Sequence, residues 1–291
     1  MNFNWSYALK KYSTKIQDVY VIFFARPFFK RFNLILFHTA LRGLGINNVT
    51  RGVPFFSPDY FSGEIDLIKK IIIKFDEKKF LYLDIGGNDG SHLKKIICDT
   101  KNIKVKIFEP SINNLKKIKK NLNLYSKRIQ CFNFKLGNKK GIEKLYDYKH
   151  SGSIHATSYK KIIQNSLRKK VITYKTKVQK IDYLKFPEKI KIIKIDVEGD
   201  ELKVLKGGIK TIIKDNPIII LEFNSCHIFS KTFLRDIMNI LYLYNVYRIL
   251  PGGKIITINK DYDSILFELF AYQNLLFYPK KDKLILDYII K

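Results

Sequence analysis

From residue 63 onward, short apolar runs alternate with longer stretches in which apolar residues recur every three to four positions. Short apolar runs between turn-forming residues are typical of buried strands, and the wider spacing is typical of amphipathic helices. Strands that alternate with helices pack as a mostly parallel sheet with helices on both faces. The sequence therefore predicts an α/β fold built on a doubly wound sheet.

The pattern also predicts where the elements lie. The expected strands are Phe80–Ile85, Lys104–Phe108, Ile129–Leu136, Ile190–Ile195, Pro217–Leu221, Tyr247–Leu250 and Asn274–Tyr278. The expected helices are Leu67–Phe75, Ser91–Cys98, a helix that begins at residues 109–111, Asp200–Lys206 with Gly207 just after its end, and residues 231–244. Charged and small residues in Gly137–Gln179 indicate an inserted hairpin and loop.

Residues 1–60 are expected to form a helical extension, and residues 61–291 to form the main domain. The first fifty residues contain seven basic residues, a single acid (Asp18) and many aromatic side chains. A membrane-spanning helix needs roughly 20 nearly uncharged apolar residues, whereas the apolar run Val19–Ala25 ends at Arg26. We expect a helical cap over one edge of the main domain, and peripheral membrane contact through this basic extension is the alternative.

The chain has 54 Lys and Arg residues against 26 Asp and Glu residues, a net charge of +28. This charge suits a nucleic acid, an anionic membrane surface or an anionic substrate. Only eight of the basic residues are Arg, and they form no stripe. Because Arg is the usual side chain for bidentate recognition of bases and phosphates, we do not expect nucleic acid as the partner.

The cysteine content bears on the compartment. Cys98, Cys131 and Cys226 form no CxxC pair, and their number is odd. This pattern favours neither a disulfide framework nor cysteine-bound zinc, and it indicates a reducing, cytoplasmic compartment. Residues 1–15 also lack the charged and apolar pattern of a secretory signal peptide.

A glycine-rich turn follows the first expected strand, where residues 84–90 have the sequence DIGGNDG. Ligands of an open α/β sheet bind beyond the carboxyl ends of its strands, and glycines let the backbone approach them closely. A dinucleotide would require the pattern GxGxxG around its pyrophosphate, but Asn88 stands at the second glycine position. Asp84 and Asp89 would repel a pyrophosphate, whereas they would attract the sulfonium and ammonium groups of S-adenosylmethionine.

The second expected strand ends at Glu109, twenty-five residues after Asp84. A carboxylate at this position can accept hydrogen bonds from both hydroxyls of an adenosine ribose. This role also occurs in dinucleotide folds, so Glu109 supports an adenosine ligand rather than a methyl donor in particular.

Further acids follow the expected strand Ile190–Ile195. Asp196 and Glu198 fall on the loop itself and are expected to face the same crevice as Asp84, with Glu222 at the end of the next strand. Carboxylates there could remove a proton from a substrate hydroxyl or hold a metal ion, although carboxylates alone do not specify which metal.

Three other polar residues near these acids are expected to have structural roles. Asp200 and Glu201 fit the solvated first turn of a helix, where acids interact with the helix dipole. His227 could act as an alternative base, but a surface or capping histidine is the expected role.

Together these segments resemble the FkbM-type methyltransferase family over roughly residues 60–280. The strongest match is IKIDVEGDE at residues 193–201, in the correct order after the glycine-rich turn. The remaining matching segments are Gly63-Glu64, residues 84–90, Phe108–Pro110, Asp182–Leu184, Val204–Gly207 and Ile220–Glu222.

The resemblance implies a class I methyltransferase (Rossmann-like) doubly wound sheet, mostly parallel with an antiparallel late strand. It implies S-adenosylmethionine as the cofactor and O-methylation of a hydroxyl, with a small-molecule or glycan acceptor from a polysaccharide or related pathway. Asp196 and Glu198 would lie near the transferred methyl group, and either could act as the catalytic base. The cofactor-binding residues that the resemblance implies are Asp84, Gly86, Gly87, Asn88, Gly90 and Glu109.

Three alternatives are less well supported by the sequence. A Rossmann oxidoreductase that modifies nucleotide sugars would require the missing glycine pattern. An RNA methyltransferase would share the cofactor, but the chain has no NPPY-like motif and no added RNA-binding module. A non-enzymatic basic protein that binds nucleic acid or a membrane surface would explain the net charge but not the acids at the strand ends.

Overall fold

The computed structural model describes most of the chain, which divides into two compact units, Met1–Leu44 and Gly45–Lys291. The boundary near residue 60, expected from composition, stays a prediction. The described residues are 15–21, 23–46, 58–75, 79–98, 100, 102–148, 156–164, 171–258 and 271–282.

The first unit is helical wherever it is described. Residues 15–21 and 23–24 are helical, and η1 (Pro27–Phe29) and α2 (Lys30–Gly43) follow. The bend between them is held by aromatic side chains, because the ring of Phe24 lies 4.7 Å from that of Tyr20 and 4.9 Å from that of Phe29. In the described part of the chain, no helix combines the length and apolar character needed to cross a bilayer.

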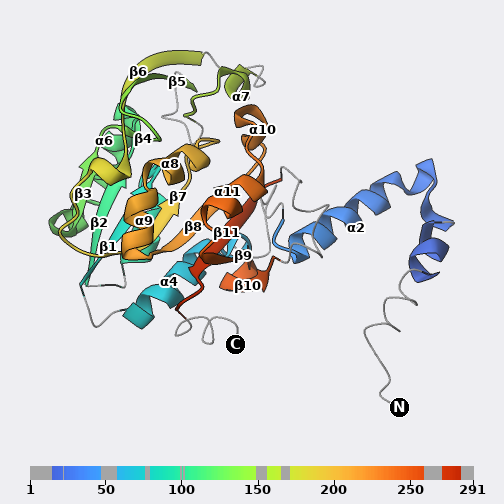
Figure 1. The fold of residues 1–291 in the computed structure, drawn as a ribbon. Coiled ribbons are helices and arrows are strands. Elements are labelled where there is room, and N and C mark those ends of the chain that lie inside the picture. The colour runs from blue at the N-terminus through green and yellow to red at the C-terminus, as the bar shows by residue number, and fades with distance from the viewer. Residues whose placement is uncertain are drawn as a thin grey trace. The chain divides into compact units, whose positions relative to one another are not determined.

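The second unit contains an eight-stranded sheet with the order β10-β9-β11-β8-β7-β1-β2-β3 (Figure 1). The five strands from β8 to β3 in this order run parallel, and β11 is antiparallel to both β8 and β9, so the predicted mostly parallel sheet with an antiparallel late strand is confirmed. The strands are β1 (Phe80–Ile85), β2 (Ile103–Phe108), β3 (Ile129–Phe132), β7 (Ile190–Ile195), β8 (Ile218–Phe223), β9 (Tyr244–Leu250), β10 (Lys254–Thr257) and β11 (Gln273–Pro279).

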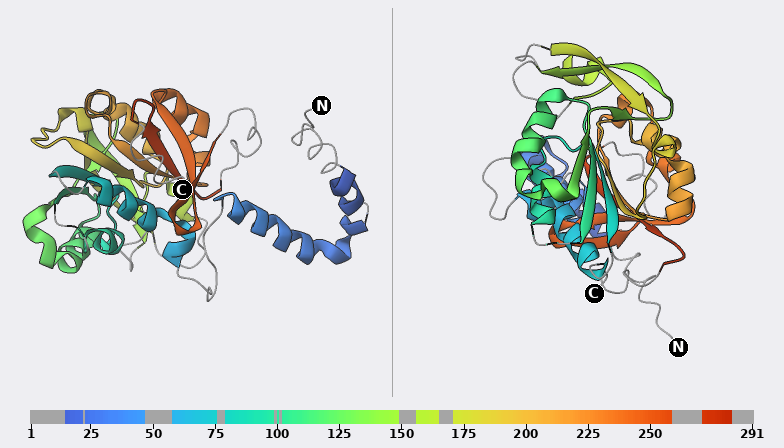
Figure 2. Two further views of the ribbon diagram at one scale, coloured as in Figure 1. Left: turned by 90° about the horizontal axis from the view of Figure 1, so that it is seen from below. Right: turned by 90° about the vertical axis from the view of Figure 1, so that its left-hand side faces the viewer.

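Helices cover both faces of this sheet, as Figure 2 shows in its right-hand view along the layers. The side chains of β1 alternate between the two cores, because successive residues of a strand point to opposite faces. Phe80 and Tyr82 pack with α4, α5 and α6, whereas Leu81 and Leu83 pack with α8, α9 and α11. These helices are α4 (Glu64–Phe75), α5 (Ser91–Ile97), α6 (Ile112–Asn121), α8 (Glu201–Gly207), α9 (Ile209–Asp215) and α11 (Leu234–Ile240).

A second, three-stranded sheet with the order β4-β6-β5 contains the predicted hairpin. Strands β5 (Gly141–Tyr148) and β6 (Val171–Gln179) are antiparallel, and the short β4 (Lys135–Leu136) is parallel to β6. Leu136 and Leu145 line a cavity together with Gly86, so this sheet covers the carboxyl ends of the main strands (Figure 1). The remaining short helices are α3 (Pro58–Ser62), α7 (Lys160–Gln164), α10 (His227–Ser230), η2 (Asn123–Arg128), η3 (Ile181–Tyr183) and η4 (Pro251–Gly253).

Some sequence-based expectations about the bounds of the elements were wrong. The segment Ile129–Leu136, expected as a single strand, is split between the two sheets at Asn133, whose side chain donates hydrogen bonds to the carbonyls of Glu109 and Pro110, both at 3.0 Å. Gly207 is the last residue of α8 rather than the residue after it. A Cβ atom at Gly207 would lie 1.9 Å from the carbonyl oxygen of Gly137, so this glycine allows the helix to approach the loop before β5.

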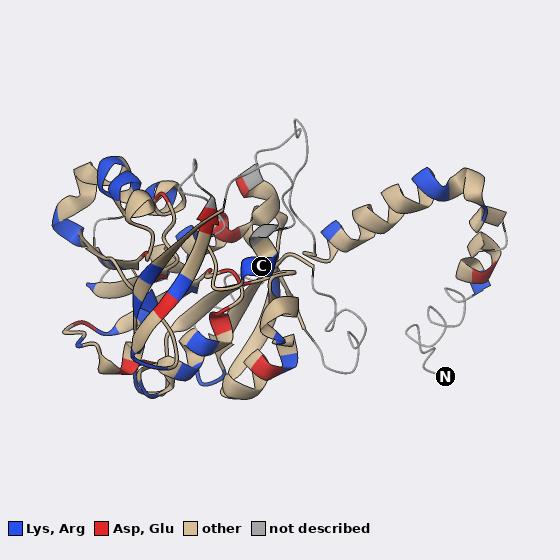
Figure 3. Cartoon of the chain, turned by 90° about the horizontal axis from the view of Figure 1, so that it is seen from above, with Lys and Arg blue, Asp and Glu red and all other residues tan. Residues whose placement is uncertain are grey.

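The helix expected at residues 231–244 is also shorter than predicted. It spans only Leu234–Ile240, and Tyr244 already belongs to β9. Lys231 has left-handed backbone geometry with φ of 53°, which ends α10 and separates it from α11. Lys and Arg residues occur on helices of both units and on strands of the second, without a single basic stripe (Figure 3).

Candidate active site

The loop after β1 lies directly against the loop after β7. Gly86 has φ of +91°, and a Cβ atom there would lie 1.8 Å from the carbonyl oxygen of Asp196. The backbone N–H of Asp196 in turn donates to the carbonyl of Ile85 at 2.9 Å. Only glycine permits both the left-handed geometry and this close approach, so the two loops that carry the predicted site residues meet at Gly86.

Glu109, at the end of β2, is held in place by two backbone groups. Its Oε2 accepts from the N–H of Asn88 at 2.9 Å, and its Oε1 accepts from the N–H of Ser111 at 2.8 Å. Burial raises the pKa of Glu109 to about 7, although these two hydrogen bonds lower it. Asn88 itself has left-handed geometry with φ of 49°, which turns its N–H toward Glu109.

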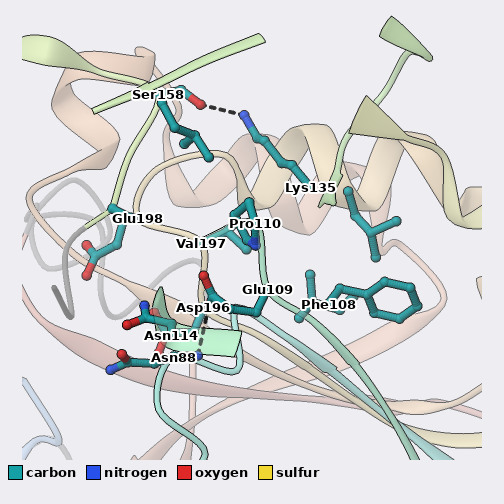
Figure 4. A pocket seen from close by; sticks show the side chains of 15 residues that line it. Asn88, Phe108, Glu109, Pro110, Asn114, Lys135, Ser158, Asp196, Val197 and Glu198 are labelled. Carbon is teal, nitrogen blue, oxygen red and sulfur yellow. Dashed lines mark hydrogen bonds between the residues drawn. The ribbon is translucent and has the colours of Figure 1, made fainter. Parts of the chain in front are cut away.

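Two cavities open at this edge of the sheet, and Gly86, Asn88 and Asp196 line both of them. The first cavity lies under the second sheet, where Glu109 and Pro110 stand beside Asn88 and Asn114 (Figure 4). The second cavity, of about 420 Å³, is rich in carboxylates. Residues that line the first include Phe108, Glu109, Pro110, Leu136 and Leu145, and residues that line the second include Glu64, Asp84, Gly87, His92, Lys194 and Glu222.

The cavity walls fit the implied cofactor. Apolar side chains and the fixed carboxylate of Glu109 suit an adenosine in the first cavity. Asp84 is only 3% exposed and lines the second cavity, and no described residue donates a hydrogen bond to its carboxylate. Burial raises the pKa of Asp84, which a cationic ligand would reverse. These residues therefore fit a positively charged adenosine compound without phosphate.

The structure brings the other predicted acids together as well. Asp196, Glu198 and Glu222 each offer an oxygen within 4.8 Å of the other two. Burial and the neighbouring Glu198 raise the pKa of Asp196 to about 6, although Lys194 lowers it. Burial and the charges of Asp196 and Glu198 raise the pKa of Glu222 well above its usual value. Among the predicted site residues, Gly90 lines neither cavity and instead precedes α5 with φ of +77°.

Sequence reasoning missed Lys194, the buried cation of this site. Lys194 lies on β7 opposite Asp84 of β1, and its Nζ is 3.0 Å from Asp196 and 3.9 Å from Glu64. Burial alone would raise the pKa of Glu64, but the charges of His92 and Lys194 lower it to about 2. A lysine inside the apolar run Ile190–Ile195 was the available signal, because such a residue is rarely buried unless it is paired.

The expected solvent exposure of Asp200 and Glu201 was wrong, and His227 is not a surface residue, because all three side chains are buried. Glu201 accepts from the N–H groups of Val197 at 2.9 Å and Gly199 at 3.0 Å, and its Oε2 lies 2.9 Å from Nε2 of His227. These contacts fix the backbone of the loop after β7. Asp200 and Glu201 are buried because the second sheet and α10 pack over the start of α8.

Asp200 links the same loop to the second sheet. Its carboxylate pairs with Lys135 of β4 and accepts from the hydroxyl of Tyr159 at 2.9 Å. Lys135 also contacts Glu143 of β5 at 2.8 Å and the hydroxyl of Ser158, the latter drawn in Figure 4. The buried ion pairs therefore fix the second sheet over the first cavity.

The mostly parallel sheet, its antiparallel late strand and the acid- and glycine-lined cavities at its carboxyl edge define a class I S-adenosylmethionine-dependent methyltransferase. Residues 84–249, more than half of the chain, match the family model described as the methyltransferase FkbM domain. The chain belongs to the FkbM methyltransferase family. No curated protein matches the sequence.

Solved structures with a similar fold include three methyltransferases. The FkbM methyltransferase from Methylobacillus flagellatus KT is 20% identical over 69% of this chain and 44% of its own, with a TM-score of 0.45. The N-terminal domain of human METTL16, in complex with SAH, is 14% identical over 82% of this chain and 78% of its own, with a TM-score of 0.41. A putative O-methyltransferase from Klebsiella pneumoniae is 9% identical over 85% of this chain and 89% of its own, with a TM-score of 0.41. At these identities the likeness concerns the fold alone.

Proposed function

We propose that the protein is an O-methyltransferase that acts on a hydroxyl of a sugar, within a polysaccharide or a related metabolite. S-adenosylmethionine, when bound, supplies a methyl group on a positively charged sulfur atom. In this proposal Glu109 binds the ribose hydroxyls and the carboxylate of Asp84 attracts the ammonium group. Both side chains line the pair of cavities that meet at Asp196.

The carboxylates beside Asp196 are the observation that carries this proposal. A hydroxyl that accepts a methyl group must lose its proton, and a carboxylate within reach can take it. The pKa of Asp196 is about 6, so at neutral pH Asp196 is ionised yet remains a stronger base than an ordinary aspartate. The acceptor oxygen gains the methyl group, and its proton passes to Asp196 or Glu198.

The charge of the second cavity favours a neutral acceptor. Acids outnumber basic residues among those that line it, because Asp59, Glu64, Asp84 and Asp89 join Asp196 and Glu222 against Lys194 and His92. A phosphate backbone would be repelled there, whereas sugar hydroxyls can donate hydrogen bonds to carboxylates. A sugar therefore fits this cavity better than RNA does. We place the reaction in the cytoplasm, where the free thiols of the three cysteines would stay reduced.

Calorimetric titration with S-adenosylhomocysteine tests cofactor binding, and transfer of labelled methyl from S-adenosylmethionine to a glycan panel and to RNA tests the acceptor. We expect micromolar binding and labelling of a glycan. Asp196→Asn should lower kcat at least 100-fold, because general-base catalysis contributes roughly 10²–10⁴-fold, while affinity for S-adenosylhomocysteine changes much less.

Glu188→Gln is the matched control, since this carboxylate pairs with Lys104 before β7 and lines neither cavity. It should leave kcat unchanged. The proposal is wrong if the protein does not bind S-adenosylhomocysteine, or if RNA accepts the methyl group and no glycan does.

A further inference from the structure

Three carboxylates from separate parts of the second unit converge beside the proposed transfer site. Asp196 and Glu198 lie on the loop after β7, and Glu222 lies on β8. Their oxygens are all within 4.8 Å of one another. Two ligands on opposite sides of an octahedral Mg²⁺ are about 4.2 Å apart, and those of a Ca²⁺ are about 4.8 Å apart. The limit of 4.8 Å equals the spacing around Ca²⁺, and a movement of about 0.6 Å brings the three oxygens to the spacing around Mg²⁺, so they can share a single hard cation.

Each carboxylate is already oriented by a neighbouring donor. The Nδ2 of Asn224 donates to Glu222 at 2.6 Å and to Glu198 at 3.3 Å, and the thiol of Cys226 donates to Glu198 at 3.1 Å. Lys194 holds one oxygen of Asp196. The second oxygens of Asp196 and Glu222 accept no hydrogen bond from any described residue. Hydrogen bonds that orient a carboxylate in this way are typical of metal ligands.

Glu64 is a further buried carboxylate at this cavity, and one of its oxygens accepts no hydrogen bond. Its side chain is 6% exposed, it lines the same cavity as Asp196 and Glu222, and its Oε1 is buried without a hydrogen-bond partner. Lys194 lies 3.9 Å from that oxygen, and Nε2 of His92 lies 3.5 Å from the other oxygen of Glu64. A buried carboxylate oxygen without a donor is costly unless a further ligand reaches it.

The net charge of the site also favours a bound cation. The buried or half-buried acids around Lys194 are Glu64, Asp84, Asp196, Glu198 and Glu222. Lys194 compensates one of these charges, and His92 compensates a second when it carries a proton. S-adenosylmethionine adds a net charge of about +1, since its carboxylate cancels one of its two cationic groups. Negative charge therefore remains in the site.

We propose that Asp196, Glu198 and Glu222 bind one hard divalent cation, Mg²⁺ or Mn²⁺, beside the site of methyl transfer. Oxygen-only ligands suit these ions rather than soft metals. The cation would coordinate a hydroxyl of the acceptor and favour its ionised oxygen, while Asp196 or Glu198 takes the proton on the oxygen that does not bind the cation. This last role rests on the proposed function, whereas binding of the cation does not.

Titration of the metal-stripped full chain with Mn²⁺, followed by the paramagnetic resonance signal of free Mn²⁺, tests the site directly. We expect one Mn²⁺ per chain, displaced by excess Mg²⁺. Glu222→Gln and Glu198→Gln should each weaken Mn²⁺ binding at least tenfold, and Glu188→Gln should not. Glu222→Gln removes a charge that its neighbours repel, so without metal the melting temperature of this variant should equal or exceed that of the wild type. This measurement distinguishes loss of a metal ligand from loss of the fold.

Absence of Mn²⁺ binding at millimolar concentration, or equal affinity in Glu222→Gln, Glu198→Gln and the wild type, would overturn the metal site. S-adenosylhomocysteine binding measured on the same samples keeps the two proposals apart. If the cofactor product binds and a glycan is methylated in the presence of a chelator, the catalytic role of the cation is wrong and the proposed function stands. If Mn²⁺ binds to these carboxylates but no glycan is methylated, the metal site stands and the proposed function is wrong.

Discussion

At the scale of the residue, Glu109 shows how strongly the site depends on burial. The carboxylate is 4% exposed and is held by the backbone N–H groups of Asn88 and Ser111. Those two bonds favour the ionised form, but burial outweighs them and raises the pKa from 4.5 to about 7. A carboxyl that prefers its proton in the folded state stabilises that state at low pH and loses this contribution as the pH rises.

We therefore predict that Glu109 makes the protein less stable toward neutral pH in the absence of ligand. The contribution of its proton is present in full below a pH of about 4.5 and is lost as the pH rises through about 7. The loss amounts to roughly 3 kcal/mol of unfolding free energy at most. Urea unfolding between pH 5 and 8, with a chelator present, should show this decline in the wild type and a smaller decline in Glu109→Gln.

Glu188→Gln should reproduce the wild-type decline, because Lys104 lowers the pKa of Glu188 and that carboxyl is ionised over the whole range. A Glu109→Gln variant whose stability falls with pH as steeply as the wild type would contradict the role of Glu109. The variants are compared by the slope of unfolding free energy against pH. The absolute values differ in any case, because the amide of Glu109→Gln accepts one hydrogen bond fewer than the carboxylate at every pH.

At the scale of the element, the site depends on how closely β1 and β7 bring their loops together. The two strands pair in parallel, with Asp84 opposite Lys194. Beyond the strand ends, the contact continues through Gly86 and the backbone of Asp196. Glu201 and His227 support this second loop from α8 and α10. Backbone contacts thus position the loop that carries Asp196 and Glu198.

Replacement of Gly86 tests this contact. Gly86→Ala should separate the two loops, because its Cβ would lie 1.8 Å from the carbonyl oxygen of Asp196 and its φ is +91°. We expect a loss of about 2 kcal/mol or more of unfolding free energy and at least tenfold weaker S-adenosylhomocysteine binding, measured by thermal unfolding and calorimetry. Gly141→Ala is the matched control, since nothing lies within 4 Å of its Cβ position. Equal behaviour of the two variants would refute the contact.

At the scale of the whole molecule, opposite charges are separated between the surface and the active site. The chain has a net charge of +28, with basic side chains on both units (Figure 3), while acids line the second cavity. The first unit also exposes large apolar side chains, among them Phe28 at 89% and Ile35 at 64%. Basic residues next to exposed aromatic ones are typical of helices that lie on an anionic bilayer. We propose such a peripheral membrane contact for residues 1–44.

Charge reversal in the first unit tests the membrane contact. The full chain should sediment with vesicles that contain phosphatidylserine and bind much less to pure phosphatidylcholine. Replacement of Lys30 and Arg31 by Glu should weaken binding at least about tenfold, because each basic residue near an anionic surface contributes roughly 1 kcal/mol. Replacement of the exposed Lys116 and Lys117 on α6 by Glu changes the net charge equally and should have a smaller effect. Equal losses in both variants would refute the specific role of the first unit.

The sequence alone determined the central strands and the turns that follow them. The predicted bounds Phe80–Ile85 and Ile190–Ile195 agree with β1 and β7 residue by residue, because a strand buried on both faces is an uninterrupted apolar run between turn-forming residues. The predicted acids at the ends of these strands do lie at the cavities, since the carboxyl ends of parallel strands share one edge. Their roles in binding and catalysis stay predictions.

Only the tertiary structure decided which polar residues are buried together. Glu64 and Lys194 are 130 residues apart in the sequence, yet they face each other in the second cavity. Burial of Asp200 and His227 likewise depends on a second sheet and a short helix that pack over the start of α8. Local sequence fixes the backbone conformation, but the burial and partners of a charged side chain depend on segments that are distant along the chain.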